Sequence, residues 1–226
     1  MPFAGRGPIA APRSRPVAPL AGLKPAFADR DDGYVRIVTL KPQEVTREIA
    51  EFLADPDVME GWNAPRRTMS LEAFRAYAAS FDNIKRNLMA IRLKDDGRPV
   101  GLIVLNIDHR HKTGAWHMCI GKAEDRGRRI GVCAGTLAVR HAFEDRKLEK
   151  LSFELLERNA NAIAIVENYG LKLEGVLRQH RVDAVSGERL DQRVYGMTAQ
   201  EYRTAVEALK PMLPPFQGPG LTPPAS

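Results

Sequence analysis

Proline placement confines regular structure to the middle of this 226-residue chain. Six of the 16 prolines lie in residues 1–30, and six more lie in residues 210–226. Proline cannot donate the backbone hydrogen bond that helices and sheets need, and both segments are poor in the β-branched and aromatic residues that offset chain entropy. We therefore predict disordered tails at 1–30 and 210–226, on either side of a single domain at 31–209.

The net charge of +6 belongs mainly to the first of these tails, since residues 1–30 carry +4 of it. The domain is therefore close to balance, and its composition does not favour nucleic acid as a partner. No stretch approaches the roughly 18 consecutive apolar residues of a membrane span, and the N-terminus lacks the apolar core of a signal peptide. The two cysteines, Cys119 and Cys133, have no metal-type spacing. We expect a reduced, cytoplasmic protein with no membrane partner and no metal.

The first half of the domain has the patterns of strands and short helices. Residues 34–40 alternate as a strand does, residues 44–54 follow a helical pattern, and Ser70 precedes a second amphipathic helix. Three extended runs follow, at 87–93, 99–107 and 115–120. The sequence Asp-Asp-Gly at 95–97 joins the first two runs as a hairpin turn, which predicts antiparallel strands.

The second half of the domain alternates helices with strands. A helical stripe covers 131–143, and a shorter helix opened by Asn159 covers 160–169. Further strands are predicted at 151–155, 173–182 and 189–197, before a final helix capped by Thr198. Hairpin strands followed by a strand–helix–strand–helix–strand unit predict an α/β (α+β) fold of three layers, in which helices cover a mixed, mostly antiparallel sheet.

The loop between the strand at 115–120 and the helix at 131–143 is the most informative stretch for function. It contains the run Arg126-Gly127-Arg128-Arg129-Ile130-Gly131. A helix N-terminus exposes unpaired N–H groups at the positive end of the helix dipole, glycine lets the backbone approach a ligand, and arginine adds charge-assisted donors. This combination favours a pyrophosphate site. The alternative is a solvated basic loop whose two glycines only form turns.

This loop resembles the acyl-CoA-binding motif of the GNAT acetyltransferases, Arg/Gln-x-x-Gly-x-Gly/Ala. A second resemblance begins at Asn159, where the family has asparagine, a short helix, a Gly-Phe step and Glu-Gly-Val before a strand. Here Gly-Leu at 170–171 and Glu-Gly-Val at 174–176 occupy those places. The resemblance covers about residues 34–205. In style the sequence is closest to the branch that acetylates ribosomal-protein N-termini, which also contains antibiotic, polyamine and amino-sugar acetyltransferases.

The resemblance implies that acetyl-CoA is the co-substrate and that the sheet splays at an acyl-CoA cleft. Backbone N–H groups of the loop would hold the pyrophosphate, from residues Arg126, Gly127, Arg128, Arg129, Ile130 and Gly131. The strand at 116–120 would part from that at 153–156, so that Met118 and Ile120 pair with pantetheine amides. The N–H of Met118 is a candidate for stabilising the oxyanion. Asn159 matches the asparagine that contacts pantetheine, and it also fits as a helix N-cap.

Three positions depart from the family pattern. Arg129 stands where the family has a glycine, so its side chain either crowds the phosphates or binds them from the rim. Ala115 stands in the place of a glutamate that often acts as the base, and Val166 in the place of a tyrosine that often protonates the thiolate. Tyr169 lies nearer the glycine of the second motif, where we expect it only to pack.

The proton acceptor must therefore come from another position, because an amine attacks a thioester only in its neutral form. His117 is the first catalytic candidate, since it lies on the same strand face as Ala115 and imidazole titrates in the useful range. Glu154, on the neighbouring strand, is the second candidate. The alternative for His117 is a strand histidine that is bonded to a carbonyl group.

Other reactive or aromatic side chains have structural interpretations beside functional ones. Trp62 and Trp116 are candidates for stacking on the acceptor substrate, although a tryptophan also fills core space. The polar turn Asp-His-Arg-His at 108–111 lacks the further ligands of a metal site, so we expect it to line an entrance or face water. Cys119 has no evident activating base, so we expect a core residue and not an acyl carrier.

Together these features predict an N-acetyltransferase that moves an acetyl group from acetyl-CoA to a primary amine by direct attack in a ternary complex. A small molecule or an amino sugar is the favoured acceptor. Two alternatives stay open: a protein N-terminus, with the basic tail steering the enzyme to ribosomes, and a catalytically impaired sensor that only binds acyl-CoA. A homodimer fits the branch that the sequence resembles, although no sequence feature decides the oligomeric state.

Overall fold

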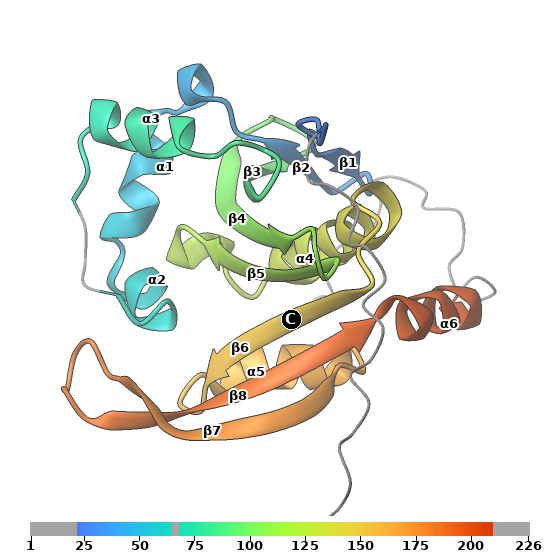
Figure 1. The fold of residues 1–226 in the computed structure, drawn as a ribbon. Helices are drawn as coiled ribbons and strands as arrows, with labels where there is room; N and C mark the ends of the chain where they lie inside the picture. The colour runs from blue at the N-terminus through green and yellow to red at the C-terminus, as the bar shows by residue number, and fades with distance from the viewer. Residues whose placement is uncertain (1–21, 65–67, 210–226) are drawn as a thin grey trace, which may run out of the picture.

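A single eight-stranded sheet forms the centre of the computed structural model, which describes residues 22–64 and 68–209 (Figure 1). The strand order is β1-β2-β3-β4-β5-β6-β8-β7, and every neighbouring pair is antiparallel except β5 and β6. The strands are β1 (Asp29–Asp31), β2 (Val35–Thr39), β3 (Arg86–Leu93), β4 (Pro99–Asp108), β5 (Thr113–Ile120), β6 (Lys150–Leu156), β7 (Lys172–Val182) and β8 (Arg189–Thr198). The predicted mixed, mostly antiparallel sheet is confirmed. Apart from residues 22–30, the predicted tails at 1–30 and 210–226 lie outside the described residues.

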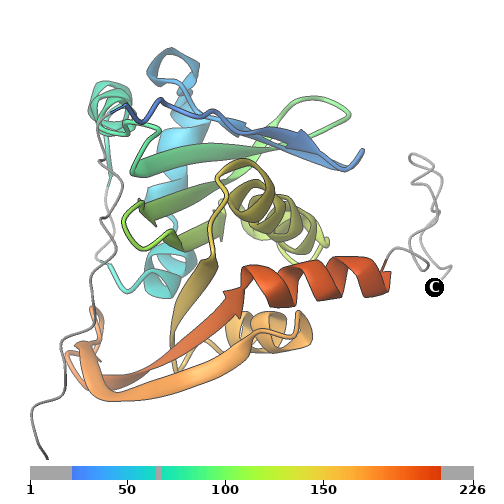
Figure 2. The same ribbon diagram turned by 45° about the vertical axis from the view of Figure 1, so that its right-hand side comes forward.

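Helices cover both faces of the sheet, so that the domain has three layers (Figures 1 and 2). They are α1 (Arg47–Glu51), α2 (Pro56–Gly61), α3 (Leu71–Ala79), α4 (Ile130–Arg140), α5 (Ala160–Asn168) and α6 (Ala199–Leu209). One hydrophobic core lies under α4, and another lies under α1 and α3. β3 and β4 are buried along most of their length because both of their faces are covered. The predicted three-layer fold is confirmed.

The predicted hairpin and helix caps form from local interactions. Gly97 takes φ +72 in the turn between β3 and β4, a conformation that favours glycine. The Ser70 hydroxyl accepts a hydrogen bond from the N–H of Ala73 at 3.1 Å. The Asn159 side-chain oxygen likewise accepts from the N–H of Ala162 at 3.1 Å. α3 and α5 begin directly after these caps, as expected.

The helical pattern predicted at 44–54 does not form one continuous helix. It is divided into a 3₁₀ turn at Pro42–Glu44, the short α1 and a second 3₁₀ turn at Phe52–Ala54. Pro56 then restricts Asp55 to extended backbone, and the Asp55 carboxylate caps α2 by accepting two N–H groups of its first turn at 3.0 and 3.1 Å. The sequence did not reveal α2, which carries the chain to the cavity described below.

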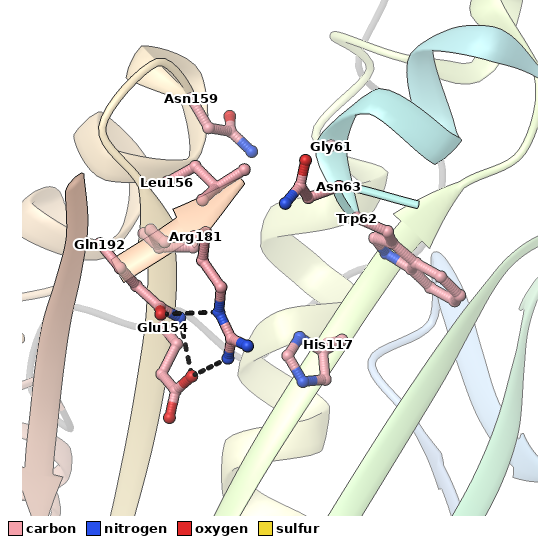
Figure 3. Close-up of a pocket in the computed structure, with 10 residues that line it drawn as sticks. Gly61, Trp62, Asn63, His117, Glu154, Leu156, Asn159, Arg181 and Gln192 are labelled. Atoms are coloured by element: carbon pink, nitrogen blue, oxygen red, sulfur yellow. Dashed lines mark hydrogen bonds and ion pairs between the residues drawn. The ribbon is translucent and has the colours of Figure 1, made fainter. Parts of the chain in front are cut away.

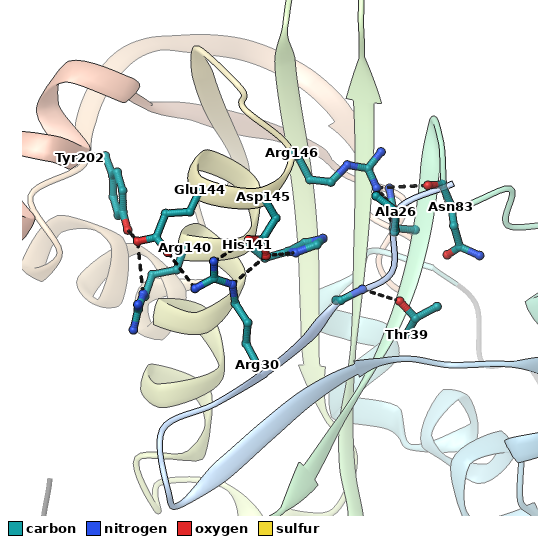
Figure 4. Close-up of polar contacts among 12 residues, drawn as sticks. Ala26, Arg30, Thr39, Asn83, Arg140, His141, Glu144, Asp145, Arg146 and Tyr202 are labelled. Carbon is teal, nitrogen blue, oxygen red and sulfur yellow. Dashed lines mark hydrogen bonds and ion pairs between the residues drawn. The ribbon is translucent and has the colours of Figure 1, made fainter. Parts of the chain in front are cut away.

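The domain begins before residue 31, so the predicted boundary is too late. β1 pairs with β2, and Ala28 is buried with its N–H donated to the Thr39 hydroxyl at 2.7 Å. Arg30 donates two hydrogen bonds to Asp145, at 2.7 and 2.6 Å (Figure 4). An edge strand of three residues has too little alternation to be recognised from sequence, and its position depends on this distant ion pair.

A polar network at the end of α4 anchors this N-terminal segment (Figure 4). Here α4 continues into a π-helical turn, in which His141 is buried with its Nδ1 2.8 Å from the Asp145 carboxylate. The hydrogen bonds from Arg30 lower the pKa of Asp145 to about 2. Arg146 donates to the carbonyl oxygen of Ala26 at 3.1 Å. The chain before β2 is therefore fixed to the domain through side chains of the π-helical turn.

Candidate active site

β5 and β6 form a V-shaped cleft because their pairing stops after three residues. Residues 113–115 of β5 lie in register with residues 150–152 of β6. Beyond them the strands part, and a cavity of about 310 Å³ opens between them (Figure 3). Its polar lining residues are Asn63, His117, Glu154, Asn159, Arg181 and Gln192. The predicted splay of the sheet at this position is confirmed.

The edge of β5 opposite β4 faces this cleft. The Gly121 N–H donates to a β4 carbonyl at 2.9 Å, and antiparallel pairs alternate in their hydrogen bonding. The backbone groups of Met118 and Ile120 therefore point away from β4 and toward the cleft. The Met118 carbonyl accepts from the indole N–H of Trp62 at 3.3 Å, and the Ile120 carbonyl accepts from Arg126 at 3.3 Å. Both carbonyls are thus engaged by the protein's own side chains, so the N–H groups are the better candidates for pairing with pantetheine.

α4 begins at the loop predicted to bind phosphate. Gly127 takes φ +71 and Arg129 takes φ +61, and both values lie in the left-handed region that favours glycine. Arg129 therefore occupies a glycine-type position, at a conformational cost of about 1 kcal/mol. The side chains of Arg128 and Arg129 are exposed at this end of α4, whereas Ile130 is buried. Two exposed cations thus lie beside the N–H groups of a helix N-terminus, an arrangement suited to an anion.

Arg126 is held by the fold more tightly than Arg128, whose Nη1 lies 3.5 Å from the Asp125 carboxylate. Its guanidinium donates to Asp55 at 2.7 Å and to Asp57 at 2.5 Å, both at the start of α2. The prediction that Arg126 adds a charged donor at the mouth of the loop is therefore corrected. Asp125 is buried beside it and accepts two hydrogen bonds from Arg98, at 2.7 and 2.8 Å. These ion pairs fix the start of the loop.

His117 and Glu154 lie on opposite walls of the cavity (Figure 3). His117 is exposed toward the cavity, and partial desolvation by the surrounding protein lowers its pKa below the ordinary value; Glu154 opposes this shift, and Arg181 adds to it. His117 is therefore neutral at about pH 7 and has a lone pair with which to accept a proton. The structure brings the two predicted catalytic candidates to one cavity, His117 from β5 and Glu154 from β6.

Two side chains that the sequence did not single out contact Glu154 (Figure 3). Gln192 Nε2 donates to Glu154 Oε2 at 2.7 Å, and Arg181 Nη2 lies 3.4 Å from the same oxygen. Arg181 Nε also donates to Gln192 Oε1 at 2.9 Å. Strand alternation could have placed Gln192 on the face that carries Leu156, its partner in β6. Arg181 follows a bulge in β7 after Leu177, so alternation could not have predicted its direction.

Hydrogen bonds join the loop after α2 to the β7–β8 hairpin at the rim of the cavity. Asn63 donates to the carbonyl of Val182 at 2.9 Å and accepts from the N–H of Ala184 at 2.9 Å. Arg158 adds an ion pair of 2.9 Å to Asp183 in the same hairpin. Segments that are far apart in the sequence therefore enclose one side of the cavity.

The model of the acetyltransferase (GNAT) domain family matches residues 35–172, more than half of the chain. The chain belongs to the GNAT acetyltransferases. Among curated protein sequences, none matches it. The predicted family is thus confirmed, whereas these findings do not support the ribosomal-protein branch in particular.

Three solved structures illustrate the likeness of the GNAT fold. A GCN5-related N-acetyltransferase from Brucella melitensis is 20% identical with a TM-score of 0.67, over 83% of this chain and 86% of that chain. A GNAT-family acetyltransferase from Bacillus anthracis is 16% identical with a TM-score of 0.65, over 78% and 100%. A spermidine N-acetyltransferase from Vibrio cholerae, in complex with CoA and spermine, is 17% identical with a TM-score of 0.67, over 75% and 98%. At these identities the likeness establishes a shared fold.

The two tryptophans predicted to contact the acceptor have different positions in the GNAT domain. Trp62 lines the cavity. Trp116 instead packs edge-on against Phe153, with ring centroids 5.3 Å apart, and lies close to Gly135 of α4. Successive residues of a strand face opposite sides of the sheet, so Trp116 cannot share the cavity face with His117. The predicted acceptor contact of Trp116 is therefore corrected to a packing role.

Other residues of the two GNAT motifs have mainly structural contacts. Asn159 caps α5 and also lines the cavity, so the two roles predicted for it are compatible. The Tyr169 hydroxyl donates to the Val132 carbonyl at 2.7 Å and so connects α5 to α4.

Cys119 of β5 is buried, and burial raises its pKa to about 12, which is consistent with the predicted core residue.

The polar turn at 108–111 is a capped turn in the GNAT domain. The Asp108 carboxylate accepts from the N–H groups of Arg110 and His111, at 2.9 and 3.1 Å. His109 Nε2 lies 2.9 Å from the Ile84 carbonyl. Among the residues that the structure describes, no group of three or more His, Cys, Asp or Glu side chains is placed to hold a metal ion. Within the same residues, no helix is both long enough and apolar enough to cross a membrane.

Proposed function

We propose that this GNAT domain transfers an acetyl group from acetyl-CoA to the primary amine of a small molecule. The observation that carries the proposal is the divergence of β5 and β6, which places His117 and Glu154 on the two walls of one cavity. Membership of the family supports acetyl transfer. The Vibrio cholerae structure, which binds CoA and spermine, supports an amine as acceptor.

The residues around the cleft fit acetyl-CoA as co-substrate. The loop has left-handed backbone at Gly127, where no atom lies within 4 Å of the place of a side chain, so a phosphate can approach the main chain. Exposed Arg128 and Arg129 would add charge at the α4 N-terminus. Asn159 and the N–H groups of Met118 and Ile120 would hold pantetheine. Acetyl-CoA supplies the reactive thioester when bound.

His117 would remove the proton that the acceptor amine must lose. Its lowered pKa keeps the imidazole neutral, and a general base of this kind accelerates reactions by about 10²- to 10⁴-fold. Glu154, on the facing wall, would orient the incoming ammonium group. This division of roles compensates for Ala115, which replaces the glutamate that resemblance to the family leads one to expect.

The amine would attack the thioester directly in a ternary complex. An acyl-enzyme would require an activated thiolate, but burial raises the pKa of Cys119 to about 12 and that of Cys133 to about 11. Both thiols are therefore protonated under ordinary conditions and are poor nucleophiles. The bridge between Asn63 and the β7–β8 hairpin at the cavity rim also favours a small acceptor over a protein N-terminus.

The experiment that tests this proposal has two parts. Calorimetric titration of the purified chain with acetyl-CoA is expected to give micromolar binding, about −8 kcal/mol, with ATP as the control ligand. Release of the CoA thiol is then followed with a panel of small amines and with a peptide. Acetyl-CoA binding without turnover of any amine would favour the sensor, turnover of the peptide alone would favour a protein substrate, and no binding at millimolar acetyl-CoA would exclude the proposed function.

A further inference from the structure

We infer that the acceptor carries a carboxylate in addition to its amine, and that Arg181 binds this carboxylate. The inference rests on the proposed function and specifies its substrate class. It differs from what the spermine complex of the Vibrio cholerae enzyme would suggest, because spermine has amines only. The argument comes from the way Arg181 is held, from its direction and from the charge of the cavity.

Arg181 is bound less tightly than the arginines that stabilise the fold. The nearest carboxylate oxygen lies 2.6 Å from Arg30, 2.7 Å from Arg98 and 2.5 Å from Arg126. Arg181 Nη2 lies 3.4 Å from Glu154, longer than the about 2.7–2.9 Å of a charge-assisted hydrogen bond. Its Nη1 makes no hydrogen bond to any part of the chain that the structure describes, and its side chain is 49% exposed. The guanidinium therefore has donors to offer to a ligand.

The chain on both sides of Arg181 is fixed, so that its side chain is aimed into the cavity (Figure 3). Gln179 takes φ +50 in the bulge, and its N–H donates to the Asp191 carboxylate at 2.7 Å. On the other side, the Val182 carbonyl accepts from Asn63 at 2.9 Å. Bulges commonly redirect a side chain toward a site, and this one gives Arg181 its direction.

The cavity has no surplus of negative charge to receive a polyamine. Among the lining residues that the structure describes, Glu154 is the one acidic residue, and Arg181 is the one basic residue apart from the neutral His117. Glu154 Oε2 already accepts a hydrogen bond from Gln192 at 2.7 Å. An acceptor with one ammonium group and one carboxylate matches this pair of opposite charges. A planar guanidinium is also the side chain best suited to bind a carboxylate through two hydrogen bonds.

The test compares acceptors that have this carboxylate with acceptors that lack it. With saturating acetyl-CoA, CoA-thiol release is measured for a panel of α-amino acids, for the corresponding amino acid amides and for spermidine. In the wild-type chain, kcat/KM is expected to be highest for an amino acid. Arg181→Gln should reduce the ratio of kcat/KM for acid over amide by about tenfold to one-hundredfold, the effect of losing a charge-assisted hydrogen bond. The amine pKa differs between the acid and the amide, but this difference affects the kcat/KM ratio equally in the wild type and in Arg181→Gln, so it cancels when the two ratios are compared.

Two further variants control the experiment. Arg178→Gln removes an exposed arginine of the same strand that does not line the cavity, and it should leave the ratio at its wild-type value. Arg181→Lys keeps the charge and should restore part of the ratio. Turnover that favours spermidine, or a ratio that Arg181→Gln does not change, would overturn the inference while the proposed function stands. Absence of turnover with every amine would overturn both.

Discussion

Arg126 and Arg181 both lie beside the cleft between β5 and β6, and their contacts differ in kind. Arg126 follows β5 in the loop that leads to α4, and two carboxylates of the α2 start hold it at 2.7 and 2.5 Å. Arg181 lies in the β7–β8 hairpin, and its one carboxylate contact is 3.4 Å long. The family motif points to Arg126, whereas no motif points to Arg181. An arginine with most of its five donors bonded to the protein, as in Arg126, stabilises the fold, and one with several free donors is available for a ligand.

The same difference applies to two regions of the cleft, the loop at the start of α4 (the loop end) and the cavity between β5 and β6 (the acceptor end). At the loop end, main-chain N–H groups and the exposed Arg128 and Arg129 are suited to phosphate, so binding there depends mainly on backbone conformation. At the acceptor end, four side chains from four strands meet, namely His117, Glu154, Arg181 and Gln192. The loop end therefore corresponds to a family motif that the sequence contains, whereas no motif predicts the side chains of the acceptor end.

The largest effect is expected at the acceptor end, from His117→Ala. Removing a general base should lower kcat by about 10²- to 10⁴-fold, because the amine then loses its proton only to water. Acetyl-CoA affinity should not change, since the variant leaves the loop intact. His111→Ala, at an exposed turn away from the cleft, is the matched control. If His117→Ala had wild-type turnover, the proton would have another acceptor, and Glu154 would be tested next.

At the loop end, Arg126→Gln is expected to act on stability more than on binding. Loss of the ion pairs to Asp55 and Asp57 should lower the free energy of unfolding by about 1–3 kcal/mol, measured by urea denaturation. Arg128→Gln should have the opposite profile, with little change in stability and about twofold to fivefold weaker acetyl-CoA binding by calorimetry. A stronger loss of acetyl-CoA binding in Arg126→Gln than in Arg128→Gln would mean that Arg126 binds the ligand and does not only stabilise the fold.

The pH dependence of kcat/KM should reveal the electrostatic link between Arg181 and His117. The base must be neutral, and the pKa of His117 is lowered from the ordinary value of histidine, so activity should fall only as the pH drops through this lowered pKa. Arg181→Gln removes a positive charge that lowers this pKa, so the acidic limb should move to higher pH. Comparison at one acceptor cancels the titration of the amine itself. A limb that stays in place would mean that Arg181 does not act on His117.

The smallest effect is expected from Arg129→Gly, which removes left-handed strain at the start of α4. The variant should gain up to about 1 kcal/mol in the free energy of unfolding, seen as a small rise in Tm. Lys147→Gly is the matched control, because Lys147 also has positive φ, +55, but lies outside the cleft. A change in acetyl-CoA affinity in Arg129→Gly alone would show whether the Arg129 side chain crowds the phosphates or binds them.

Much of the fold follows from local sequence, and so do the positions of the two motifs. Alternation located seven of the eight strands, and Ser70 and Asn159 marked helix starts through hydrogen bonds that span three residues. The one strand missed, β1, has three residues and is held by Arg30 through Asp145, more than a hundred positions away. Local rules carry no information about such a contact.

The sequence by itself determined the family through its motifs, and the resemblance to that family implied the splayed sheet. It also determined the strand face of His117, because alternation along a strand depends only on short-range spacing. The phosphate loop stays a prediction from the same motifs. Tertiary structure decided how the remaining side chains are used. Trp116 packs against Phe153 in the core, and Arg126 forms an ion pair with Asp55 at the start of α2. Arg181 lines the cavity. The physical reason is that the direction and the partners of a long or charged side chain are set by neighbours from distant segments, here the α2 carboxylates and the bulge of β7.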